Sequence, residues 1–437
     1  MKRKEFFTAA GAATVGAIGG FGFGRAVTST SPASSTGSSP ITTLGGKTLE
    51  EHRQKYRADL FDRFLPYMDD TVIDHELGGF MCAVNIETGE RESDDKRAWY
   101  EGRGMWVYSF LYNNVEADPR YLEIARKSKD FILPLEPDNG AFYATSFSRT
   151  GEPLTGPGDI YGNLFVAEGL AEYAKASGEM EYYDKATEMI LYCFDRYEDS
   201  SYVFRDNMGL SDTRVVGHWM IFLRLITQML RYRDNADLEQ IADRAIEAIL
   251  ELHMDPEYNL HNEYRRHDYS KPDGEYHDYC NTGHSIETFW MLMDEAARRR
   301  DASLFEAAKD GFQRHMAVAK DRVYDGYFFE LRDVNDYDWT VRKVLWEHEE
   351  ILIGTLLIAE HTGDTWAKET FADLDEYVRK TFTRPGYRFW ASGGNRRLTE
   401  LNMVRAEHYH HPRHLMLNLL AIERLIERNG EPTGIFG

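Results

Sequence analysis

Residues 283–293 read Gly-His-Ser-Ile-Glu-Thr-Phe-Trp-Met-Leu-Met, so a histidine and a glutamate open a long apolar run with helical spacing. Similar polar clusters precede other apolar runs at intervals of about sixty residues. The six clusters begin at Ala98, Tyr161, Gly217, Gly283, Trp346 and Tyr409. This recurrence indicates that every second helix begins at one common site.

The helical period continues from about Leu49 to the end of the chain and predicts about a dozen helices in pairs. The predicted pairs are 98–115 with 119–133, 158–176 with 180–198, 212–230 with 235–253, 281–299 with 302–319, and 343–361 with 364–381. A first helix near 47–68 and a last near 409–428 form the sixth pair. Links within pairs are short and links between pairs are longer, which predicts function on the long-loop face.

Six helical hairpins can form an open solenoid or a closed barrel. In an open superhelix the polar clusters would lie roughly tens of ångströms apart and would have no reason to share histidine and glutamate. Closure brings all six to one mouth. We therefore predict an all-α (α/α)6 barrel, with residues 46–437 as one domain.

The formal net charge of −22 argues against nucleic acid or an anionic membrane as a partner. Cys82, Cys193 and Cys280 are scattered and indicate neither a disulfide framework nor a zinc site. No segment after the N-terminal region is long and apolar enough to span a bilayer, so we expect no stable membrane insertion of the mature domain. A monomer and a homodimer both remain open.

Residues 1–45 have the composition of an export signal and linker. Lys2-Arg3-Lys4-Glu5-Phe6-Phe7 precedes an alanine- and glycine-rich stretch, and a run rich in serine, threonine and proline follows. The order resembles a twin-arginine signal with lysine in place of the second arginine. We expect a periplasmic or cell-surface protein; an uncleaved membrane anchor and a disordered tail are the alternatives.

The clusters combine histidine, glutamate and arginine without a nucleophile elbow or a phosphate loop, a set suited to proton transfer. Two histidines can take and return a proton at one substrate carbon. Removing a proton next to a carbonyl creates an enediolate, whose charge Arg103 could stabilise. Glu287 lies one helical turn after His284 and can fix its tautomer or raise its basicity.

Each residue alone also has a simpler interpretation. His284 could be a helix cap or a core polar group, and Arg103 could form a structural ion pair with Glu101 or Glu350. Glu350 could be a first-turn acid favoured by the helix dipole. Recurrence at equivalent helix positions favours a shared site.

The densest histidine stretch, residues 407–414, places His410 and His414 at the spacing of a metal-binding helix face. However, no HExxH arrangement is present, and Pro412 places His410 before the first helical turn. We expect neither a metal nor another cofactor.

Five segments in order resemble motifs of the N-acylglucosamine 2-epimerase family, which also contains cellobiose 2-epimerases and mannose-type aldose–ketose isomerases. They are Trp-Tyr-Glu-Gly-Arg at 99–103, the Tyr-x-x-x-Phe-x-x-x-Gly-Leu pattern at 161–170, Gly-His-Ser-Ile-Glu at 283–287, Trp-x-x-x-Glu at 346–350 and Tyr-His-His-Pro-Arg at 409–413. The resemblance covers nearly the whole region after the linker. It departs at Glu101, where the family usually has glutamine, and at Thr282, where proline is common.

The resemblance implies the six-hairpin barrel, with His284 and His410 as the acid/base pair. It also implies that Arg103 stabilises the intermediate while Glu287 and Glu350 support the histidines and the sugar hydroxyls. Further candidate residues for substrate binding are His218, Tyr161, Asn163, Glu263, Trp346 and Trp99.

The leading hypothesis is a cofactor-independent sugar 2-epimerase or aldose–ketose isomerase that acts on a small sugar or oligosaccharide. A glycoside hydrolase or polysaccharide lyase on the same barrel is an alternative, although a hydrolase needs a suitably separated carboxylate pair. A helical scaffold that binds a glycan without chemistry is the third reading.

Overall fold

The computed structural model describes residues 40–204 and 210–436. The predicted export signal and the linker up to residue 39 lie outside the described residues. The final residues of the predicted linker already belong to the folded unit. Ile41 and Leu44 are buried, and the Ile41 amide donates to the carbonyl of Gly430 at 2.7 Å.

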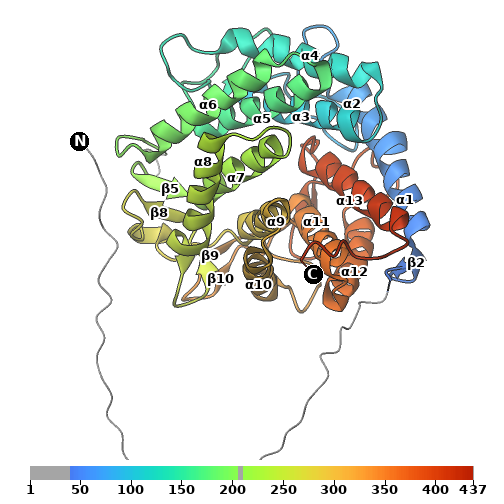
Figure 1. Ribbon diagram of the computed structural model, residues 1–437. Helices are drawn as coiled ribbons and strands as arrows, with labels where there is room; N and C mark the ends of the chain where they lie inside the picture. The colour runs from blue at the N-terminus through green and yellow to red at the C-terminus, as the bar shows by residue number, and fades with distance from the viewer. Residues whose placement is uncertain (1–39, 205–209, 437) are drawn as a thin grey trace, which may run out of the picture. The chain divides into compact units, whose positions relative to one another are not determined.

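Six inner helices form a closed ring (Figure 1), because each packs on the next and the last packs on the first. They are α3 (Ala98–Asn114), α5 (Ile160–Ser177), α7 (Val216–Leu230), α9 (Thr282–Arg299), α11 (Leu345–Thr362) and α13 (His410–Glu427). All six run in the same direction relative to the ring, since an outer helix returns between each inner helix and the next.

The outer helices each cover one inner helix. They are α4 (Pro119–Ile132), α6 (Glu181–Glu198), α8 (Ala236–Glu247), α10 (Ala302–Ala319) and α12 (Thr365–Thr381). α1 (Leu49–Ala58) packs on α13 and continues through a π-helical segment (Asp59–Phe64) into α2 (Leu65–Thr71). The predicted all-α barrel of six helical hairpins is confirmed.

The sequence explains the two layers. Inner helices are almost entirely buried, whereas outer helices bury one stripe, such as Tyr183 and Ile190 on α6. Side-chain caps begin several outer helices, for example Asn235 before α8 and Asp301 before α10. Gly178 ends α5 in the left-handed conformation, which explains the abrupt turn to α6.

Short antiparallel strand pairs lie among the long connections, and none of them was predicted. With two or three residues, each is too short to show an alternating pattern. The pairs are β1 (Thr43–Leu44) with β2 (Lys47–Thr48), β3 (Lys96–Arg97) with β4 (Ser146–Phe147), β5 (Thr213–Val215) with β8 (Tyr264–Arg266), β6 (Met254–Asp255) with β7 (Leu260–His261), β9 (Leu331–Asp333) with β10 (Asp338–Trp339), and β12 (Gly393–Gly394) with both β11 (Lys343–Val344) and β13 (Leu401–Asn402). β3, β5 and β11 run directly into α3, α7 and α11, so they fix where these inner helices begin.

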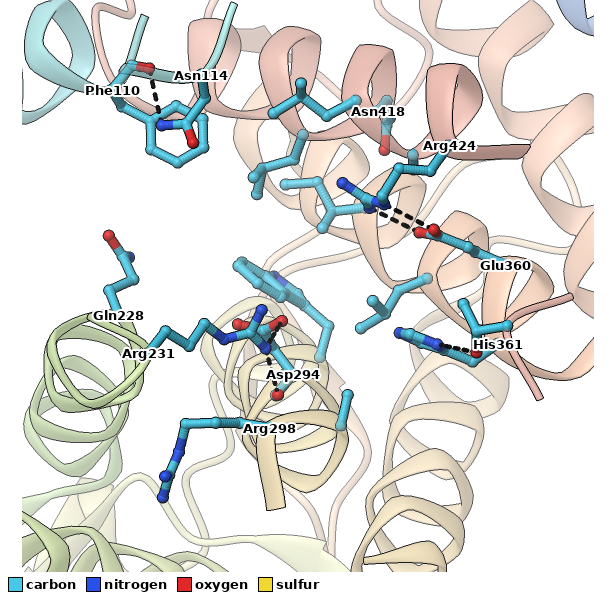
Figure 2. A pocket seen from close by; sticks show the side chains of 18 of the residues that line it. Phe110, Asn114, Gln228, Arg231, Asp294, Arg298, Glu360, His361, Asn418 and Arg424 are labelled. Atoms are coloured by element: carbon cyan, nitrogen blue, oxygen red, sulfur yellow. Dashed lines mark hydrogen bonds and ion pairs between the residues drawn. The ribbon is translucent and has the colours of Figure 1, made fainter. Parts of the chain in front are cut away.

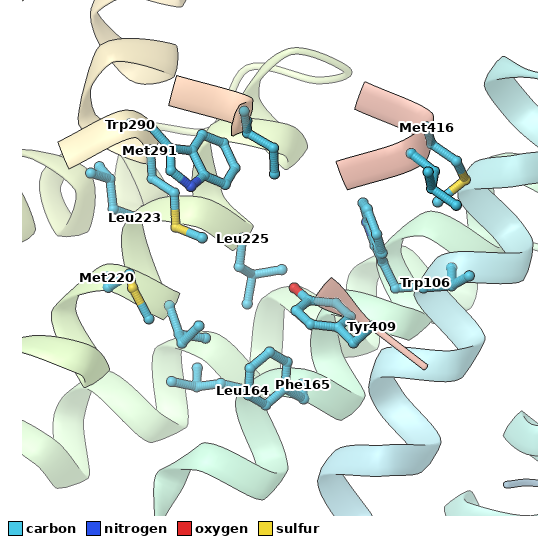
Figure 3. Packing of buried hydrophobic residues seen from close by; sticks show 14 of the residues in the cluster. Trp106, Leu164, Phe165, Met220, Leu223, Leu225, Trp290, Met291, Tyr409 and Met416 are labelled. Atoms are coloured by element: carbon cyan, nitrogen blue, oxygen red, sulfur yellow. The ribbon is translucent and has the colours of Figure 1, made fainter. Parts of the chain in front are cut away.

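Large side chains fill the interior of the ring (Figure 3). Trp106 from α3 meets Tyr409 edge-on, with ring centroids 5.5 Å apart, and Phe165 from α5 meets the same tyrosine at 5.6 Å. The middle of the barrel is therefore packed. Among the described residues, no helix combines the length and apolar character needed to cross a membrane.

Candidate active site

Each inner helix places one aromatic or imidazole ring at or near its N-terminal end. On one side of the mouth, Trp99 of α3 lies 5.9 Å from Tyr161 of α5, and Tyr161 lies 5.6 Å from His218 of α7. On the other side, the indole of Trp346 on α11 contacts both His284 of α9 and His410 of α13, with centroid distances of 5.7 and 5.4 Å. The polar helix starts converge on one end of the barrel.

His284 pairs with a carboxylate from a loop. Its Nδ1 donates to Oε1 of Glu263 at 2.8 Å, and Glu263 lies between β7 and β8 in the insert that precedes α9. Burial alone lowers the pKa of His284, but the charge and hydrogen bond of Glu263 outweigh it and raise the pKa. The expectation that Glu287 fixes the His284 tautomer is therefore wrong, because the returning insert supplies the carboxylate at Nδ1. The alternative expectation holds, since the charge of Glu287 adds to that of Glu263 in raising the pKa of His284.

His410 is held by a different carboxylate. Its Nδ1 donates to Oε1 of Glu350 at 2.8 Å, and the other oxygen of Glu350 accepts from Nε1 of Trp290 at 2.7 Å. His284 and His410 thus share the main features of one arrangement: Nδ1 faces a buried glutamate, and Nε2 makes no hydrogen bond within residues 40–204 and 210–436. Such a carboxylate fixes the Nδ1–H tautomer and leaves the Nε2 lone pair available. The two histidines differ in that Nη2 of Arg413 also lies 3.1 Å from Nδ1 of His410.

Arg413 joins the two carboxylates behind His410. Its Nη2 donates to Glu287 and, at 2.6 Å, to Glu350, and the side chain is fully buried. Burial raises the pKa of Glu287, but the charge of Arg413 prevails and lowers it. We did not single out Arg413 from the sequence, although it ends the Tyr-His-His-Pro-Arg motif.

Glu407 fixes the start of α13. Its Oε1 accepts from the backbone amides of Tyr409 and His410 at 3.1 and 3.2 Å, and its Oε2 pairs with Arg405 at 3.1 Å. Burial raises the pKa of Glu407, yet the charge of Arg405 and its neighbours holds it well below its usual range. An anionic cap at this position orients the backbone that carries His410.

Arg103 is enclosed by aromatic rings rather than by carboxylates. Its guanidinium carbon lies 4.1 Å from the ring centroid of Phe165, 4.5 Å from that of Tyr409 and 4.7 Å from that of Trp99. It makes no hydrogen bond or ion pair with the described part of the chain, so the simpler interpretation of a structural ion pair with Glu101 or Glu350 is wrong. Its charge lowers the pKa values of both His284 and Glu407.

Glu101 faces away from Arg103. Its carboxylate accepts from the amide of Phe80 at 3.0 Å and from the hydroxyl of Ser128 on α4 at 2.7 Å, and burial raises its pKa to about 7. Asn163, a candidate for substrate binding, uses its Oδ1 to accept from the Tyr143 amide at 3.0 Å. That oxygen supports the loop before α5.

Within residues 40–204 and 210–436, two groups of buried side chains have ligand atoms close enough to surround a cation. Arg413 already bridges the carboxylates of the first group, which contains Glu287, Glu350 and His410. In the second group, Nδ1 of His411 and of His414 lie 2.5 and 3.3 Å from Oε1 of Glu349. His410 and His414 belong to different groups and do not form one metal-binding face.

The family model of N-acylglucosamine 2-epimerase (GlcNAc 2-epimerase) matches residues 57–413. The N-acylglucosamine 2-epimerase of Bos taurus is 26% identical over 375 residues, which cover 80% of this chain and 85% of that protein. The cellobiose 2-epimerase of Spirochaeta thermophila DSM 6192 superposes with a TM-score of 0.74 at 20% identity, covering 86% of this chain and 98% of that one. A D-mannose isomerase superposes with a TM-score of 0.68 at 16% identity, covering 87% and 97%. The chain therefore belongs to the N-acylglucosamine 2-epimerase family and is, by that membership, an isomerase.

Proposed function

We propose that the protein is a sugar 2-epimerase or aldose–ketose isomerase in which His284 and His410 exchange a proton with carbon 2 of an open-chain aldose. The observation that carries the proposal is the pair of imidazoles that both contact the indole of Trp346. Each has a buried glutamate at Nδ1, and each has an Nε2 without a protein partner in the described chain.

The sequence of proton movements follows from this pair. One imidazole takes the proton from carbon 2, and the electron pair moves toward the carbonyl oxygen to give an enediolate. Delivery of a proton to the opposite face of carbon 2 by the other imidazole gives the 2-epimer. Delivery to carbon 1, with transfer of the hydroxyl proton between the two oxygens, gives the ketose.

Arg103 is the group we assign to the enediolate oxygen. Its charge has no ion-pair partner among the described residues, and the rings of Phe165, Tyr409 and Trp99 surround it. A positive donor that is fixed before the reaction stabilises the developing negative charge without reorganisation. Trp99, Tyr161 and His218 form the opposite wall, and flat rings of this kind suit the apolar face of a sugar.

The proposal is tested by proton NMR of the purified protein in D2O. The panel contains N-acetylglucosamine, cellobiose and mannose, one for each kind of relative or structural neighbour named above. Loss of the carbon-2 proton signal together with a new epimer or ketose supports the proposal and identifies the substrate class. Absence of exchange with every sugar at millimolar concentration contradicts it and favours the alternatives of a hydrolase, a lyase or a binding protein.

A further inference from the structure

Besides the mouth that holds His284 and His410, the barrel has a cavity of about 990 Å³ at the opposite end, where the inner helices end. All six inner helices line it with residues from their C-terminal halves, and neither His284 nor His410 belongs to its lining. Figure 2 shows Arg231 and Asp294 on one side of this cavity and Arg424 and Glu360 on the other. Its size is that of a small-molecule site.

The lining is basic although the chain is acidic. Lysine and arginine outnumber aspartate and glutamate by seven to three among the lining residues, against a net charge of −22 for the whole protein. Most of the cations have partners, as Arg231 has in Asp294 at 2.8 Å and Arg424 in Glu360 at 2.7 Å. They also lie near helix C-termini, where the helix dipoles favour positive charge. These cations do not require a ligand.

Arg224 differs from them in position and in pairing. It lies in the middle of α7, is only 4% exposed, and makes no hydrogen bond or ion pair with the described residues. Its guanidinium carbon lies between two indoles, 5.3 Å from the ring centroid of Trp106 and 5.4 Å from that of Trp290. The charge of Arg224 lowers the pKa of the buried Glu168 carboxyl against the effect of burial, but that carboxylate takes its hydrogen bond from Tyr409. A buried guanidinium without an acceptor is costly, so the vacant donors need an explanation.

Gln228 adds another donor one helical turn further along α7. Its Oε1 accepts from Nε1 of Trp106 at 2.8 Å, which turns the amide so that Nε2 is buried without a partner among the described residues. Nε and Nη2 of Arg224 are likewise buried and unpartnered. Within the described part of the chain, three buried N–H-bearing nitrogens on α7 therefore lack acceptors, from two side chains that both line the cavity.

We propose that this cavity binds a small oxyanion, carrying phosphate or carboxylate groups, at Arg224 and Gln228. Such a group accepts hydrogen bonds from the guanidinium and the amide together. The half-exposed arginines of the lining, Arg231 and Arg424, attract it from solvent. The inference does not rest on the proposed catalysis. The cavity has one structural link to the mouth, because the Trp290 indole that flanks Arg224 also donates a hydrogen bond to Glu350.

Isothermal titration of the full chain with inorganic pyrophosphate and, separately, with citrate tests the proposal. We expect saturable binding of at least one anion with a stoichiometry of one per chain, weakened by added salt and accompanied by a change in tryptophan fluorescence. Pyrophosphate alone identifies a phosphate ligand, and citrate alone a carboxylate ligand. Binding of neither at millimolar concentration overturns the proposal.

Variants locate the site. Arg224→Gln is expected to weaken binding by about tenfold or more, because it removes a charged donor. Gln228→Glu supplies Arg224 with a carboxylate while keeping an acceptor for Trp106, so it is expected to raise the Tm and abolish binding. The control is Arg233→Gln, which removes a surface arginine paired with Asp184 outside the cavity and leaves binding unchanged. Binding that survives Arg224→Gln and Gln228→Glu but is lost in Arg103→Gln places the anion at the mouth and overturns the proposal.

Discussion

Glu263 holds His284 although it lies twenty-one positions earlier in the chain. The distance from Oε1 of Glu263 to Nδ1 of His284 is 2.8 Å. The carboxylate is buried, and its second oxygen has no hydrogen-bond partner among the described residues. It arrives on the insert whose β8 pairs with β5 beside the start of α7. This insert therefore positions the imidazole of His284 in the site.

Glu263→Gln is expected to lower the pKa of His284, because it removes the charge that overcomes the effect of burial. The acidic limb of the kcat/KM profile that reports this imidazole then moves to lower pH, and kcat falls as the base weakens. Glu257→Gln, an exposed glutamate of the same insert, is the matched control and leaves the profile unchanged. An unmoved acidic limb in Glu263→Gln contradicts the role assigned to Glu263.

Arg413→Gln is expected to destabilise the protein by about 3–5 kcal/mol at pH 8, because two buried carboxylates lose their common cation. The loss is smaller at pH 3, which is below the unfolded pKa of a glutamate, about 4.3. Arg413 lowers the folded pKa of Glu287, so its contribution is present above the unfolded pKa and declines as the pH falls toward the folded pKa. Urea unfolding at the two pH values measures both effects.

The control for this variant is Arg231→Gln, which breaks a half-exposed ion pair with Asp294 and costs about 1 kcal/mol or less. Equal losses for the two arginines would show that Arg413 does not hold the carboxylates together.

Glu101→Gln is expected to stabilise the protein by about 1–3 kcal/mol at pH 8 and to have little effect near pH 4. Burial raises the folded pKa of this carboxyl to about 7, so folding binds a proton and stability falls as the pH rises toward that value. Above it, the folded state carries a buried charge that glutamine lacks. Thermal unfolding from pH 4 to pH 8 measures the difference, with the exposed Glu188→Gln on α6 as control.

Gly283→Ala is expected to displace the indole of Trp346, which contacts both His284 and His410, because an added Cβ would lie 2.4 Å from its Cη2. We expect kcat/KM to fall about tenfold or more with the helical content unchanged. Gly162→Ala is the matched control. It lies in the first turn of α5, where an added Cβ meets only the Cβ of Ala98 at an ordinary 3.4 Å. Equal activity of the two variants would contradict the role of Trp346 in spacing the imidazoles.

The sequence predicted the barrel because its periodicity is local. Each inner helix is a long apolar run with a polar start, and α9 and α10 were placed within one residue of their observed bounds. The same recurrence located His284, Trp346 and His410 at one end. These features depend on residues that are neighbours along the chain.

The pairing of side chains could not be read in the same way. Glu287 is one turn from His284 in sequence, yet it pairs with Arg413, which is 126 residues away. Only ring closure brings α9 and α13 close enough for this contact, and only the fold of the insert brings Glu263 to His284. The cavity at Arg224 could not be predicted for the same reason, because residues from all six inner helices form it together.

The central claim is that one of the two histidines, His284 or His410, removes the proton from carbon 2 and that the other delivers a proton to the intermediate. It is tested most directly by following interconversion and deuterium incorporation in D2O with His284→Gln and His410→Gln, using the aldose that the wild-type protein converts. We expect each variant to fold and to lose interconversion by about 10²–10⁴-fold, with any residual exchange confined to the isomer whose proton the remaining imidazole takes. Interconversion at the wild-type rate in either variant would contradict the account.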